Sequence, residues 1–150
     1  VDDFLQLQKK VAFFGVFNSL SQTVLKLGSP GVADIYQGNE LWDFSLVDPD
    51  NRRPVDHDLR RELLAFLLAH ADDRPALVKT LLEQRDDGRI KLYVSQRLLC
   101  LRRERPGLFV GGSYTPLRGN ANVAAFARAS DGHTLLVAAR ERGDLGRRGD

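Results

Sequence analysis

Residues 28–56 read GSPGVADIYQGNELWDFSLVDPDNRRPVD, and this segment carries the clearest signals of the fold class. A Gly-Ser-Pro-Gly turn opens a short apolar run, Val32–Tyr36, which leads into a polar loop holding the only tryptophan, Trp42. A turn, a short apolar strand and a polar loop in this order are typical of a β/α barrel, where the loops after the strands build the site. The pattern therefore predicts a parallel strand over 32–36, buried on both faces, with a functional loop after it.

The loop after the predicted strand contains more charged and aromatic side chains than a simple connecting loop needs. It combines carboxylates, two adjacent arginines and an aromatic pair, namely Glu40, Asp43, Asp48, Asp50 and Asp56 with the upstream Asp34, Arg52 and Arg53, and Trp42 and Phe44. A guanidinium can bond hydroxyl groups through its fixed fork of donors while a carboxylate holds its far side. Together with aromatic faces, such pairs indicate a sugar site.

Two segments of this stretch carry a resemblance to a known family. GVADIYQGNE (residues 31–40) resembles the G-x-P-x-x-Y-x-G-x-E element on the eighth barrel strand of the α-amylase family of glycoside hydrolases. ELWDFSLVDPDNRRPVD (residues 40–56) is similar to the maltooligosyltrehalose synthase branch of that family, which are intramolecular glucosylmutases. A third segment, LRRERPGLF (residues 101–109), resembles the helix end that leads these enzymes into a C-terminal β-domain. The resemblance covers roughly Phe4 to Arg140 and departs at Ala33, where the family usually has proline.

The resemblance implies an α/β fold that is the end of a TIM-type β/α barrel. Residues 1–56 would be the last helix, the eighth strand and its loop, residues 57–106 a helical segment, and residues 107–150 the start of an antiparallel C-terminal β-domain. The chain begins on Val1 and contains no methionine, so we expect it to be a piece of something longer.

The resemblance also implies an activity and its substrate. Such an enzyme cleaves the terminal α-1,4 bond of a maltooligosaccharide, retains the freed glucose and rejoins it through an α,α-1,1 link, without an organic cofactor. The family's catalytic carboxylates lie on the fourth, fifth and seventh strands, so we expect no catalytic residue in this chain. Six residues are expected to support the substrate, namely Tyr36, Glu40, Trp42, Asp48, Arg52 and Arg53.

Arg52 and Arg53 carry the sharpest expectation. A mutase must hold the freed glucose loosely while it turns and must keep water from the glycosyl-enzyme. The loop after the last strand lies on the active face of a barrel. We therefore expect at least one of the two arginines to line the subsite of the released glucose, with Trp42 or Tyr36 nearby.

Two other readings of the sequence stay open. One is a noncatalytic carbohydrate-binding or interaction domain, which the absence of the catalytic carboxylates favours. The other is a fragment of an α-amylase-type hydrolase whose loop matches the mutase branch. Catalytic carboxylates on successive barrel strands would separate the enzymes from the binding domain.

Composition places few further limits on function. Lysine and arginine outnumber aspartate and glutamate by 22 to 20 and the two signs alternate, so the charge balance argues neither for nor against a nucleic-acid partner. The arginines between 97 and 105 are interrupted by Glu104 and have no interleaved stacking aromatics, so no nucleic-acid partner is expected. The single Cys100 excludes an internal disulfide and fits a reducing cytoplasm. The longest apolar run, Leu63–Ala69, is far shorter than the roughly 20 residues that span a bilayer.

No metal site is expected from the sequence. The three histidines lack both mutual spacing and suitable acidic partners for zinc. The segment from Asp48 to Asn51 begins like a calcium loop, but Arg52 and Arg53 stand where glycine and further ligands are needed.

The remaining sequence predicts helices followed by strands. Apolar spacing of three and four predicts helices over 3–27, 58–71, 76–85 and 90–103, with a capping box from Asp3 to Gln6 and a cap at Asp73. Turn residues then separate short apolar runs at 108–110, 114–117, 123–127 and 134–139, which predict a β-domain. Residues 140–150 have no periodicity.

Overall fold

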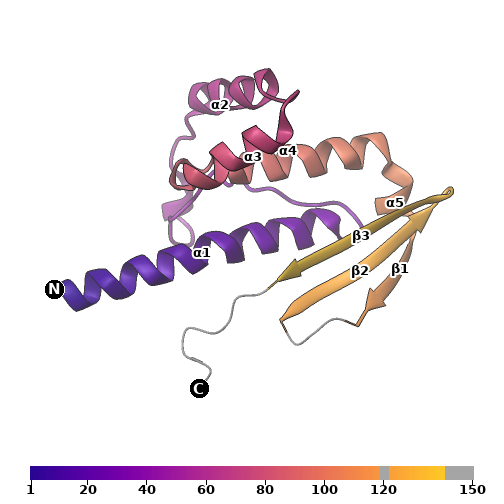
Figure 1. The fold of residues 1–150 in the computed structure, drawn as a ribbon, viewed down its shortest axis with the longest axis horizontal. Coiled ribbons are helices and arrows are strands. Elements are labelled where there is room, and N and C mark those ends of the chain that lie inside the picture. Colours follow the sequence, from indigo (N-terminus) through magenta and orange to yellow (C-terminus); the bar gives the residue numbers. More distant parts are fainter. Residues whose placement is uncertain (119–121, 141–150) are drawn as a thin grey trace. The chain divides into compact units, whose positions relative to one another are not determined.

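The computed structural model describes residues 1–118 and 122–140, so the expected turn around Gly119 and the aperiodic tail after Arg140 lie outside the described residues. Five α-helices precede a three-stranded antiparallel sheet (Figure 1). The helices are α1 (Asp2–Gly28), α2 (His57–Ala69), α3 (Arg74–Glu83), α4 (Arg89–Glu104) and α5 (Pro106–Val110). The strands are β1 (Ser113–Leu117), β2 (Val123–Ser130) and β3 (His133–Arg140), with short 3₁₀ turns at Asp50–Arg52 and Arg85–Asp87. The mixed α/β class is confirmed.

The chain forms two compact units. One combines residues 1–33 with residues 98–150, and the other contains residues 34–97. The first holds α1, α5 and the sheet, and the second holds the loop, α2 and α3, while α4 contributes residues to both. The expected division at 56 and 106 concerns roles in a larger protein and stays a prediction.

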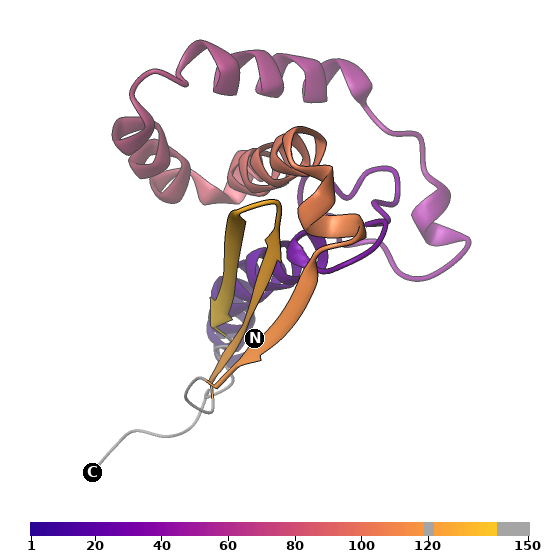
Figure 2. The same cartoon turned by 90° about the vertical axis from the view of Figure 1, so that its right-hand side faces the viewer.

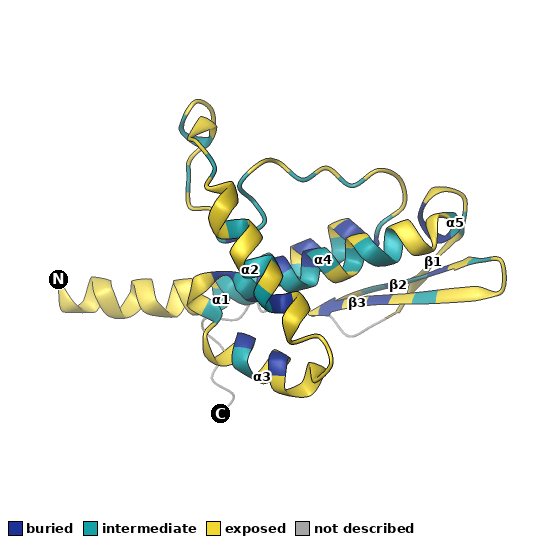
Figure 3. Cartoon of the chain, turned by 90° about the horizontal axis from the view of Figure 1, so that it is seen from above, coloured by how far each residue is buried: buried dark blue, intermediate teal, exposed yellow. Residues whose placement is uncertain are grey.

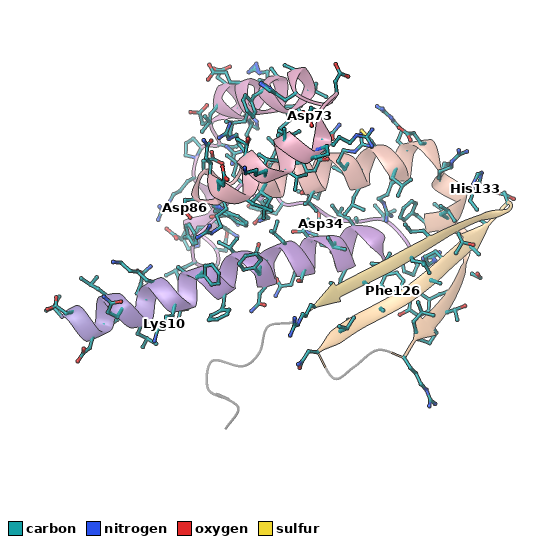
Figure 4. All side chains as sticks on the ribbon, viewed as in Figure 1. Lys10, Asp34, Asp73, Asp86, Phe126 and His133 are labelled. Atoms are coloured by element: carbon teal, nitrogen blue, oxygen red, sulfur yellow. The ribbon has the colours of Figure 1, made fainter. Side chains whose placement is uncertain are left out.

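The sheet of the first unit follows the expected turn chemistry. β2 pairs with both neighbours in antiparallel register (Figure 2). Asp131 and Gly132 both have positive φ, 50° and 76°, as a two-residue hairpin turn between Ser130 and His133 requires. Figure 4 labels His133 at this turn. The predicted turn between the apolar runs at 123–127 and 134–139 is confirmed.

One face of the sheet packs on helices. Phe126 pairs with Val137 across the sheet, and both side chains are buried. α1 and α5 contact the sheet, and Leu27 and Phe109 are buried in this unit. The N-terminal half of α1 is exposed instead, including Phe4 and most of the apolar residues near it (Figure 3). The apolar stripe of this helix is therefore only partly covered within the chain.

Arg102 of α4 satisfies the C-terminal end of α1. Its guanidinium donates to the carbonyl oxygens of Leu27 and Ser29 at 2.7 and 3.0 Å and also to that of Gly31. The same group lies 4.4 Å from the centre of the Phe109 ring. The last carbonyls of a helix have no partner inside the helix, so this side chain serves as their external cap.

Three expectations about local structure are wrong. Residues 32–36 are extended but form no strand, because no neighbouring strand in the described residues offers them a backbone ladder; Val32 is 98% exposed. The apolar run at 108–110 is part of α5, which begins at Pro106 and buries Leu108 and Phe109. The capping box at Asp3 is absent, since α1 begins one residue earlier with Val1 at the cap position and no side-chain cap.

Within the residues the structure describes, no helix is both long and apolar enough to cross a bilayer.

Candidate functional site

A pocket of about 390 Å³ lies in the unit formed by residues 34–97. Its walls come from the loop between Gln37 and Asp56 and from Arg60 in the first turns of α2. The pocket therefore depends on the stretch that the sequence singled out, together with one side chain from the helix that follows. Its lining is mixed, with aromatic, carboxylate, guanidinium and amide groups.

Arg60 fixes the start of the loop onto α2. Its Nε donates to Glu40 Oε2 at 2.9 Å, its Nη2 to the Gly38 carbonyl at 2.8 Å, and its Nη1 to the Asp56 carbonyl at 2.9 Å. The Gly38 N–H also donates to Glu40 Oε2 at 3.1 Å. Gly38 has φ 95°, a conformation that favours glycine. The loop is thus tied at its first turn by one guanidinium and one carboxylate.

Glu40 is held in its ionised form by these bonds. Burial raises the pKa of the Glu40 carboxyl, but hydrogen bonds from backbone N–H groups and from Arg60, with the Arg60 charge, outweigh this and leave the pKa below its usual value.

Trp42 is positioned by contacts behind the pocket. Its indole Nε1 donates to the Arg85 carbonyl at 2.8 Å, and Lys91 Nζ lies 5.7 Å from the ring centre. Lys91 is buried and donates to the Leu41 carbonyl at 3.1 Å. Gly88 has φ 81°, and a Cβ there would come within 3.1 Å of the Trp42 backbone nitrogen. The indole is therefore held from several directions while it lines the pocket.

Two aspartates of the pocket wall accept hydrogen bonds from their own loop. Asp43 Oδ1 accepts from the Ser45 hydroxyl at 2.6 Å and from the Ser45 N–H at 2.9 Å, and these bonds lower the pKa of Asp43. Asp50 accepts from the Leu46 N–H at 2.7 Å and pairs with Arg53, and these bonds lower the pKa of Asp50. A general acid must carry a proton at working pH, so a carboxyl with a lowered pKa is poorly suited to that role. The wall is better suited to binding than to acid catalysis.

The structure separates the six predicted site residues. Trp42 and Arg53 line the pocket, and Glu40 stands behind it through Arg60. Tyr36, Asp48 and Arg52 do not line it. Arg52 pairs with Asp48 on the exposed side of the 3₁₀ turn, and Tyr36 is 40% exposed.

Several lining residues are not among the six predicted ones, including Asp43, Phe44, Asn51 and Arg60. Asp43 and Phe44 belong to the carboxylates and the aromatic pair that mark this loop in the sequence. Arg60 could have been predicted, because it lies four residues after Asp56, the N-cap of α2, and residues at this spacing share one face of a helix. Asn51 had no such signal, because its position depends on the 3₁₀ turn.

The described residues contain no group of three or more His, Cys, Asp and Glu side chains that could hold a metal ion.

Comparisons with known proteins find similar sequences and solved structures of the same kind of enzyme. No family model matches the chain. A Mycobacterium tuberculosis protein, provisionally assigned as a maltooligosyl trehalose synthase in strains CDC 1551 and H37Rv, is 42% identical over 125 residues, which is 81% of this chain. The chain spans only 13% of the length of these curated relatives.

Two solved structures are also similar. A crystal structure of a maltooligosyl trehalose synthase matches 97% of this chain with a TM-score of 0.82 and 34% identity, over 19% of its own chain. The maltooligosyltrehalose synthase from Arthrobacter ramosus matches 91% of this chain with a TM-score of 0.67 and 37% identity, over 16% of its own chain. Both sequence and fold therefore match one part of these proteins.

Proposed function

The chain is homologous to one segment of the maltooligosyl trehalose synthases, and we propose that it works as part of an intramolecular α-glucosyl transferase. This enzyme converts the terminal α-1,4 link of a maltooligosaccharide into an α,α-1,1 trehalosyl link. The observation that carries the proposal is the match of 97% of the chain, at 34% identity and a TM-score of 0.82, to a solved enzyme of that name.

Within such an enzyme, this chain supplies support rather than the reacting carboxylates. Retaining glycosyl transfer needs a nucleophile and an acid/base carboxyl about 5 Å apart. Asp43 and Asp50 accept hydrogen bonds from their own loop, and Glu40 is bonded to Arg60. The proposal places residues 1–56 at the end of a β/α barrel and the reacting groups on other barrel strands. A cytoplasmic location, expected from the single cysteine, is part of the same proposal.

The experiment is a product assay on a full-length protein that carries this segment. Maltopentaose is incubated with the purified protein, and two products are measured. One is free glucose, and the other is a nonreducing oligosaccharide that still contains all five glucose units. We expect the nonreducing trehalosyl product to dominate. Glucose release alone would indicate a hydrolase, and binding without turnover would indicate a carbohydrate-binding protein; either result overturns the proposal.

A further inference from the structure

We propose that the pocket in the loop and α2 is a subsite for one neutral pyranose ring, held by Arg53 and Phe44, and that Arg52 takes no part in it. This inference rests on the proposed function for the identity of the sugar as a glucosyl unit. Its other supports are the charges, the exposure and the lining of the pocket.

The charges of the pocket favour a neutral ligand. Three carboxylates and two guanidinium groups line it, and each already has a partner inside the unit. Arg60 is bonded to Glu40 and Arg53 to Asp50, while Asp43 and Asp56 accept backbone hydrogen bonds within the loop and at the start of α2. An anionic ligand would have to compete with these pairs and face the extra carboxylate. A polyhydroxyl ligand can instead donate and accept at paired groups without breaking them.

The pocket also offers hydrogen-bonding groups that suit hydroxyls. The Oδ1 atom of Asn51, which lines the pocket, is buried and has no hydrogen-bond partner among the described residues. A buried acceptor without a partner is costly, so rotation of the Asn51 amide toward the pocket, where it would accept from a bound hydroxyl, would relieve it. Arg53 is 73% exposed beyond its pairing with Asp50, which leaves its remaining N–H groups facing solvent at the pocket wall.

An aromatic surface completes the arrangement. Phe44 lines the pocket although it is 89% exposed, so its ring contributes little to the packed interior of the unit. An apolar ring in this position can cover the C–H face of a sugar, as aromatic side chains commonly do in ligand pockets. The next exposed apolar residue, Leu46, belongs to the same loop at 77% exposure and does not line the pocket.

The chain supplies a matched control for each binding residue. Arg52 and Arg53 are adjacent, similarly exposed at 68% and 73%, and each is paired with an aspartate three or four residues earlier, yet only Arg53 lines the pocket. Leu46 serves in the same way for Phe44. All four side chains are exposed enough that truncation should leave the protein folded.

The test compares Arg53→Ala with Arg52→Ala and Phe44→Ala with Leu46→Ala in the full-length protein. The KM for maltopentaose and the ratio of free glucose to trehalosyl product are measured. We expect Arg53→Ala to raise KM roughly tenfold, as loss of a hydrogen bond from a charged donor does. Phe44→Ala should raise it about fivefold. Both changes should increase the glucose ratio, and both controls should stay within about twofold of the unmodified protein.

The outcomes separate this inference from the proposed function. If trehalosyl product forms normally and Arg53→Ala and Phe44→Ala behave like their controls, the subsite is wrong and the proposed function stands. If the unmodified protein turns over no maltopentaose, the same variants are compared by isothermal titration calorimetry with that sugar. Binding that depends on Arg53 and Phe44 but not on Arg52 would then keep the subsite without the mutase. Absent or control-like binding would overturn both.

Discussion

The two adjacent arginines show how much one residue position decides in this loop. Arg52 and Arg53 are chemically identical and each pairs with a nearby aspartate, but only Arg53 reaches the pocket wall. The 3₁₀ turn over Asp50–Arg52 ends between them, so Arg52 is in the turn while Arg53 is extended, with φ −64° and ψ 149°. A sequence pattern treats such neighbours as equivalent, whereas the backbone places only Arg53 at the pocket.

At the residue scale, Glu40 makes stability depend on pH. Its pKa is lowered in the folded chain, so its contribution is fully present above the ordinary value of 4.5 and is lost as pH falls through the folded pKa. We expect Glu40→Gln to destabilise by about 1 kcal/mol at pH 7, an amount reduced by its partial exposure. The difference from the unmodified chain should shrink as pH falls below 4.5.

Urea midpoints measured between pH 2.5 and 7 check this prediction. Glu62→Gln in α2 serves as the control, since the Glu62 side chain is exposed and forms no hydrogen bond or ion pair with the residues that the structure describes. Equal midpoints for the two variants across the whole pH range would show that the Arg60 and Gly38 bonds do not stabilise the fold.

At the element scale, α3 depends on its N-cap. Asp73, labelled in Figure 4 before this helix, accepts a hydrogen bond from the Ala76 N–H at 3.1 Å. Asp73→Ala should cost about 1 kcal/mol, because an N–H of the first turn then loses its partner. Asp72→Ala removes an equal charge one residue earlier and should change stability far less. Chemical denaturation followed by circular dichroism compares them, and equal losses would contradict the cap assignment.

The C-terminal end of α1 packs closely on β3 at Gly28. A Cβ at Gly28 would come within 2.8 and 3.0 Å of the two γ carbons of Val137 in β3. We expect Gly28→Ala to destabilise by about 1–2 kcal/mol through overpacking, despite the better helix propensity of alanine. Gly15→Ala in the same helix meets nothing within 4 Å and should stabilise by up to about 1 kcal/mol.

A double-mutant cycle with Val137→Ala tests this contact. Removing the γ carbons opens the space that the new methyl needs, so the double variant should be more stable than the sum of the single changes by at least about 0.5 kcal/mol. Thermal midpoints of the four proteins give the coupling. Strict additivity would mean that the helix and β3 adjust without strain.

At the scale of the whole molecule, the 150 residues by themselves should not catalyse transfer. Binding groups alone cannot supply the acid, the nucleophile and the transition-state charge together. Incubating the folded chain with maltopentaose should give no trehalosyl product above a buffer control, while a full-length protein carrying the segment serves as the positive control. Turnover by the chain alone would place a catalytic carboxyl pair within it.

The elements that could be predicted from the sequence are those with local signals. Apolar spacing with Gly28 and Pro30 set the end of α1, Asp73 set the start of α3, and the Asp131–Gly132 turn set the β2–β3 hairpin. Each signal acts within a few residues through backbone conformation or one short hydrogen bond, so it can be read without knowing the neighbours. The family resemblance was likewise carried by short local segments, residues 31–40, 40–56 and 101–109.

Features that need a distant partner could not be predicted from the sequence and become visible only in the folded chain. Residues 32–36 form no strand because a strand requires another strand beside it, and residues 108–110 are helical because Leu108 and Phe109 bury themselves within the unit that holds the sheet. Which residues line the pocket depends likewise on a distant partner. Arg60 bonds to Gly38, Glu40 and Asp56, and Gly38 lies 22 residues before it in the sequence. Strand pairing and burial each involve two segments of the chain, so the residue pattern of one segment is not enough to predict them.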